Sequence, residues 1–81
     1  MSIEDAINKI KGLITAIAAD AVFRVKKMSD EEARVSVYVP GDKVQAITDG
    51  TRDAVIQLLS AEGLDVQVFP YDIGATTPPP E

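Results

Sequence analysis

Cysteine and histidine are both absent from this 81-residue chain. Their absence excludes disulfide bonds, thiolate and imidazole metal ligands, and the general base that enzymes use most often. Aromatic residues are scarce at 5%, so a core must be built from isoleucine, valine, leucine and alanine. A chain of this length forms one domain, and we expect that domain to bind neither a cofactor nor a metal ion.

Long apolar runs and a net positive charge are lacking as well. No part of the sequence approaches the roughly 18 consecutive apolar residues that a membrane-spanning helix needs. The first residues, MSIEDAINKIKGL, place acids and lysines where a signal peptide has its positive and apolar regions. The net charge of −5 opposes nonspecific attraction to nucleic acid or to an anionic membrane. We expect a cytoplasmic protein with no membrane association.

The hydrophobic pattern changes its period along the chain. Apolar residues recur at helical spacing from about residue 3 to 18, and Ser2 is placed to cap this helix with Asp5 three residues on. The period becomes two over residues 21–39, apart from a polar turn at 29–32. This alternation predicts a β-hairpin with one buried face.

A second helix is predicted over residues 42–62. Asp42 is its expected N-cap with Gln45 in the capping-box position, and Gly63 is its expected stop. The apolar stripe of this helix is predicted to comprise Val44, Ile47, Ala54, Val55, Leu58 and Leu59.

The weak point of the second helix is the tetrapeptide Thr48-Asp49-Gly50-Thr51. We favour one helix with a local defect over two short helices that meet here. Two helices would give the order α-β-β-α-α-β, which resembles the topology of one class of KH nucleic-acid domains. Such domains hold the nucleic-acid backbone with a GxxG loop that is typically basic. The tetrapeptide has one glycine and an acid instead, which argues against that function.

A third strand over residues 64–69 completes the pattern and fades at Pro70-Tyr71. The order α-β-β-α-β, with one apolar side to each strand, predicts an α+β two-layer sandwich: a three-stranded mixed sheet with two helices on one face. The strands that flank the second helix run parallel, either adjacent or separated by the first strand. We expect a single α+β domain over residues 1–71 and a disordered proline-rich tail over 72–81.

The polar residues form no recognisable catalytic or cation-binding pattern. The acidic turn at residues 29–32 lacks the alternating oxygen ligands and the glycine of an EF-hand loop. Asp49 and Asp53 lie four residues apart, on what we predict to be the exposed side of the second helix. No carboxylate interrupts an apolar stripe, where burial would raise its pKa into a catalytically useful range. We therefore expect no enzymatic activity.

The sheet face that the helices leave uncovered is the predicted interaction surface. Arginine and tyrosine are favoured at protein interfaces, and the apolar residues on this face favour cover by a partner. We expect a protein partner, and a homodimer is the simplest version because edge strands also invite a partner strand. The predicted interaction face comprises Val22, Arg24, Lys26, Arg34, Tyr38, Phe69 and Tyr71.

Two alternatives remain open from the sequence. In the first, the same face binds nucleic acid: Tyr38 and Phe69 stack on bases while the three basic residues of the face contact phosphates. In the second, the chain is a small-molecule-sensing dimer with anion sites at the Gly41-Asp42 and Gly63-Leu64 junctions. An N-cap at Asp42 would already satisfy the helix donors, which disfavours the sensor.

Overall fold

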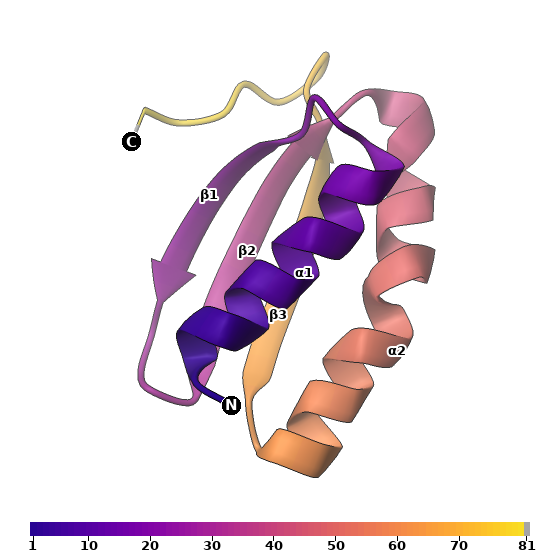
Figure 1. Cartoon of the computed structure of the whole chain (residues 1–81). Helices are drawn as coiled ribbons and strands as arrows, with labels where there is room; N and C mark the ends of the chain where they lie inside the picture. The colour runs from indigo at the N-terminus through magenta and orange to yellow at the C-terminus, as the bar shows by residue number, and fades with distance from the viewer. Residues whose placement is uncertain (81) are drawn as a thin grey trace.

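The computed structural model describes residues 1–80 and has the predicted element order (Figure 1). Both helices lie on one face of the three-stranded mixed sheet, so the predicted α+β two-layer sandwich is confirmed. The elements are α1 (Ile3–Ile17), β1 (Val22–Lys27), β2 (Glu32–Val39), the 3-10 turn η1 (Gly41–Lys43), α2 (Val44–Glu62) and β3 (Asp65–Asp72).

The strand order is β1-β2-β3, with β1 antiparallel and β3 parallel to the central β2. This order settles the point that the sequence left open, because the two strands flanking α2 are adjacent. Their pairing runs from Glu32 opposite Asp65 to Val39 opposite Asp72. The sheet of residues 1–80 therefore has two edges, β1 and β3.

The core lies between the helices and the sheet and is aliphatic, as the scarcity of aromatic residues predicts. Every second residue of β2, from Ala33 to Val39, is fully buried under the helices. The fully buried side chains with the largest volumes are Ile3, Ile10, Ile14, Ile47, Val35, Val37, Val39 and Val66.

The start of α1 forms the predicted capping box. The Asp5 N–H donates to Ser2 Oγ at 3.1 Å, and the Ser2 N–H donates back to Asp5 Oδ2 at 3.5 Å. These bonds satisfy donors that the first helical turn leaves without partners.

Helix α2 is continuous through the predicted weak point, so the preference for one helix is confirmed and the KH-like order is excluded. A Cβ atom on Gly50 would lie 2.5 Å from Cδ1 of Ile17 on α1. Glycine is therefore the residue that lets the two helices approach here. Thr51 is buried, and its hydroxyl donates to the Ile47 carbonyl at 2.8 Å.

The predicted cap at the start of α2 is wrong. Asp42 lies in η1, the N-cap position falls on Lys43, and neither makes the expected capping bond. Pro40 starts a 3-10 turn, closed by the Lys43 N–H bond to the Pro40 carbonyl at 2.8 Å, which moves the helix start beyond Asp42. Gln45 donates instead to Asp49 Oδ1 at 3.0 Å. Gly63 ends the helix as predicted, with a φ of 67°.

Strand β3 does not fade at Pro70, contrary to the prediction. The Asp65 N–H donates to the Glu31 carbonyl at 2.7 Å, and the Ile73 N–H to the Val39 carbonyl at 2.9 Å. Since backbone groups alternate along a strand, odd-numbered residues of β3 face β2 and even-numbered residues face the free edge. Pro70 therefore lies where a missing N–H breaks no bond to β2.

The C-terminal segment turns at residues 73–76 and then runs back past the start of β1 (Figure 1). Asp72 pairs with Val39, so strand β3 ends one residue beyond residue 71. Disorder of the tail stays a prediction, and Glu81 lies outside the described residues.

Candidate interaction surface

The strand register places all seven predicted interface residues on one face of the sheet, opposite the helices. Directly paired residues of neighbouring strands share a face, and the pairing defines rows across the sheet. We call this surface the open face. Its rows are Val22–Tyr38–Tyr71, Arg24–Ser36–Phe69, Lys26–Arg34–Gln67 and Glu32–Asp65.

The first row is apolar and aromatic. The rings of Tyr38 and Tyr71 stack with centroids 5.2 Å apart and planes 20° from parallel. Tyr71 remains 37% exposed, whereas Tyr38 is only 6% exposed. Tyr38 thus supports the ring of Tyr71 and offers little surface of its own, and its contact with a partner stays a prediction.

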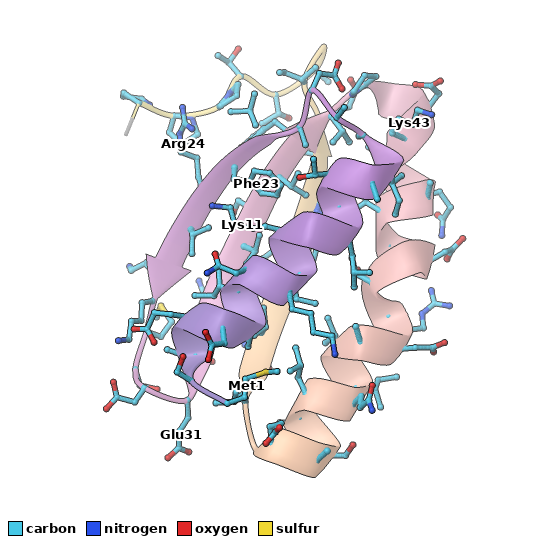
Figure 2. The ribbon with its side chains drawn as sticks, in the orientation of Figure 1. Met1, Lys11, Phe23, Arg24, Glu31 and Lys43 are labelled. Atoms are coloured by element: carbon cyan, nitrogen blue, oxygen red, sulfur yellow. The ribbon has the colours of Figure 1, made fainter. Side chains whose placement is uncertain are left out.

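The second row joins an exposed ring to an arginine that is already engaged. Phe69 is 39% exposed. Arg24 Nη1 donates to the Phe23 carbonyl at 2.8 Å, and Arg24 Nε donates to the Pro79 carbonyl at 2.6 Å. Figure 2 shows the Arg24 side chain reaching from β1 to the C-terminal segment. A backbone carbonyl of the C-terminal segment thus already accepts a hydrogen bond at this corner of the open face.

The third and fourth rows carry opposite charges. Lys26 and Arg34 are exposed neighbours in the third row. Beside them, Gln67 Nε2 donates to Glu32 Oε2 at 3.0 Å and to Asp65 Oδ2 at 3.2 Å, which links the third row to the acidic fourth. The open face therefore changes along the strands from aromatic, through basic, to acidic.

On the helix side, polar contacts join α1 to the edge strand β1. Lys11 Nζ lies 5.2 Å from the centroid of the Phe23 ring (Figure 2). Lys27 Nζ donates to Glu4 Oε1 at 2.7 Å. This hydrogen bond lowers the pKa of Glu4 below its ordinary value of 4.5 and raises the pKa of Lys27 above 10.5.

A second surface, which the sequence did not reveal, lies where α2 meets the edge strand β3. A hollow of about 190 Å³ is lined there by Thr48, Thr51, Arg52, Val55, Ile56 and Val68. Ile56 is 58% exposed, and Leu59, predicted to belong to the buried stripe, is 54% exposed. One residue of the sequence could have indicated this surface: Ile56 is a large apolar residue on the side of the second helix that is otherwise polar.

The surroundings of the two junctions proposed as anion sites disfavour an anion. A Cβ atom on Gly41 would lie 2.6 Å from Asp72 Oδ2, so a carboxylate occupies the surroundings of the first junction. Gly63 lies at the C-terminal end of α2, where the helix dipole repels anions.

Within residues 1–80, no group of three His, Cys, Asp or Glu side chains is placed to hold a metal ion. In the same part of the chain, no helix combines the length and the apolar character that crossing a membrane requires. Comparison of the chain with protein-family models, with curated proteins and with solved structures gives no match, so function must be inferred from the residues themselves.

Proposed function

We propose that this chain is a non-enzymatic protein-interaction module whose open face binds a segment of a partner protein. The observation that carries the proposal is the exposed pair Phe69 and Tyr71 beside the exposed cations Lys26 and Arg34, on the face opposite both helices. Aromatic side chains and arginine are enriched at protein interfaces. A cytoplasmic location stays a prediction from the sequence.

The partner segment that fits this face combines apolar side chains with acidic ones. Its apolar residues would cover Phe69 and Tyr71, and its carboxylates would pair with Lys26 and Arg34. The bond from Arg24 to the Pro79 carbonyl supports peptide binding at this corner, because a backbone carbonyl already accepts a hydrogen bond there.

A second copy of the chain fits the open face less well. A two-fold axis that runs along the strands, in the plane between two such faces, brings the basic third row of one copy against the same row of the other. Like charges in contact oppose association. Nucleic acid also has less support, because Tyr38 is stacked on Tyr71 and cannot stack on a base.

Selection from a display library of short random peptides tests the proposal. We expect the selected peptides to be enriched in aspartate, glutamate and large apolar residues. Binding should fall at least about tenfold for Lys26→Glu and for Arg34→Glu, and also for Phe69→Ser. Lys9→Glu is the matched control, because Lys9 is an exposed cation on α1 and its replacement should leave binding unchanged.

Two results would contradict the proposal. One is a set of selected peptides whose binding is indifferent to Lys26→Glu and Arg34→Glu. The other is an absence of peptide binding together with binding of single-stranded homopolymer RNA that weakens steeply as salt rises, which would establish the nucleic-acid function instead.

A further inference from the structure

We propose that two copies of this chain pair through the free edge of β3, antiparallel across a two-fold axis, so that their sheets become one continuous sheet. The surface involved is the second one described above, built from β3 and α2. The side chains that the pairing buries lie on α2 and on the helix side of β3, whereas the open face uses the opposite side of the sheet. The pairing can therefore be tested without changing any open-face residue.

The backbone of β3 offers a short stretch of unpaired groups for a new strand. Even-numbered residues of β3 point their N–H and C=O groups to the free edge, as the flanking bonds of Asp65 and Ile73 require. Pro70 has no N–H to offer there. Val66 and Val68 are left with both a donor and an acceptor facing outward, and they form the part of the edge that is able to pair.

In an antiparallel pairing of two β3 strands, the outward N–H and C=O groups of both residues form hydrogen bonds. With the two-fold axis at Gln67, Val66 of each copy lies opposite Val68 of the other, and each of these pairs exchanges both backbone bonds. Pro70 then lies beyond the hydrogen-bonded centre, where its missing donor costs nothing in the new ladder. The edge is thus complementary to itself, as a two-fold interface demands.

The side chains on the helix side of this edge are the ones that lack cover. Val68 and Ile56 line the same hollow, so Ile56 lies close to the proposed axis. Leu59 follows Ile56 by three residues and therefore lies on the same side of α2. In a continuous sheet the two copies of α2 lie side by side over the seam, and Ile56 and Leu59, exposed by 58% and 54%, become buried there.

The charges favour the β3 edge over the β1 edge. Strand β1 carries Arg24, Lys26 and Lys27, and two such strands would oppose like charges. At the β3 edge the cation that lines the hollow, Arg52, is paired with Asp49 at 3.3 Å. In the proposed register Asp65 faces Phe69 of the second copy and not another acid.

Light scattering after size exclusion tests the pairing. The wild-type chain should reach twice its mass of 8.7 kDa at high concentration, with little effect of salt. Ile56→Lys and Ile56→Glu should each weaken dimerisation by at least about tenfold, since like charges then meet near the axis. An equimolar mixture of the two variants should recover the dimer, a result that damage to the fold would not produce.

The matched control is Gln57, the next residue on the same helix, about 100° further around its axis. Gln57→Lys and Gln57→Glu should leave the dimer intact. Amide hydrogen exchange adds a backbone readout: the N–H groups of Val66 and Val68 should exchange more slowly in the wild-type dimer than in the Ile56→Lys monomer.

Three results would overturn the pairing: a monomer at every concentration, a mass that grows without limit as β1-to-β3 association would give, or a dimer that survives both Ile56 variants. Peptide binding measured on the Ile56→Lys monomer tests the proposed function separately, because Lys26, Arg34 and Phe69 lie on the open face and Ile56 lies on α2.

Discussion

Gly50 sets the spacing between two helices that are distant in the sequence. A glycine inside a helix costs about 1 kcal/mol relative to alanine. Glycine fits here despite that cost, because the Cβ atom of any other residue would lie 2.5 Å from Cδ1 of Ile17, which is closer than two carbon atoms can pack. The sequence marks Gly50 as a defect in α2, but only the packed structure identifies the atom that a side chain would strike.

A double-mutant cycle tests this contact. Gly50→Ala alone should change the free energy of unfolding by less than about 1 kcal/mol, because the gain in helix propensity is offset by displacement of Ile17. Ile17→Val removes Cδ1, so Gly50→Ala in that background should stabilise the protein by about 1 kcal/mol. Urea denaturation measures all four proteins. Strictly additive effects would show that the two residues do not meet.

At the scale of the elements, glycine has opposite roles within and after a helix. Gly12 lies on an exposed part of α1, and no heavy atom of the described residues lies within 4 Å of a Cβ built on it, apart from its own helix backbone and its chain neighbours. The close approach to the sheet that such a glycine could permit does not occur. Gly63 instead has a φ of 67°, a conformation that strains other residues.

The same substitution at the two sites should therefore have opposite signs. Gly12→Ala should stabilise the protein by about 1 kcal/mol through helix propensity. Gly63→Ala should destabilise it by about 1 kcal/mol because alanine resists the left-handed conformation. Thermal and urea unfolding of the two variants, each compared with wild type, measures both changes. Equal signs would mean either that Gly12 does not lie inside a helix or that Gly63 is not left-handed.

Element boundaries do not follow from the hydrophobic period alone. The start of α2 moves past Asp42 because Pro40 begins a 3-10 turn. Strand β3 continues through Pro70 because the missing N–H falls on the free edge. Both differences concern where an element starts or stops, whereas the type of each element follows from its hydrophobic period.

At the scale of the whole molecule, the edge strand β1 is tied to the helix layer partly by charge. Lys27 on β1 donates to Glu4 in the first turn of α1 at 2.7 Å, and the pKa of Glu4 is lowered as a result. A group whose pKa is lowered by folding stabilises the folded state above its unfolded pKa. That contribution is lost as the pH falls below 4.5 and through the folded pKa.

Lys27→Gln should raise the pKa of Glu4 toward 4.5, since the main cause of its lowering is removed. A carbon-detected NMR titration of the Glu4 carboxyl measures the change. The variant should also be less stable than wild type at neutral pH, with the difference vanishing in acid. Lys26→Gln is the matched control, because Lys26 points to the open face and its loss should leave the Glu4 titration unchanged. A similar shift in both variants would contradict the direct bond.

For the candidate surfaces, the sequence pattern predicted which side chains share a face, and tertiary packing decided which of them are exposed. The period of two placed every predicted interface residue on one face, because side-chain direction along a strand is a local property. Burial on that face was not predictable: Tyr38 is covered because β3 lies beside β2 and brings Tyr71 against it. The exposure of Ile56 and Leu59 likewise depends on where the sheet ends beneath α2.

The sequence by itself determined the aliphatic core, the α-β-β-α-β order, the two layers and the residues of the open face, because composition and hydrophobic period act within short stretches of chain. The tertiary structure decided the strand order, the path of β3 through Pro70, the contact of Gly50 with Ile17 and the uncovered edge beside α2. These features arise between residues far apart in the sequence, where relative placement is set by the packing of whole elements against one another.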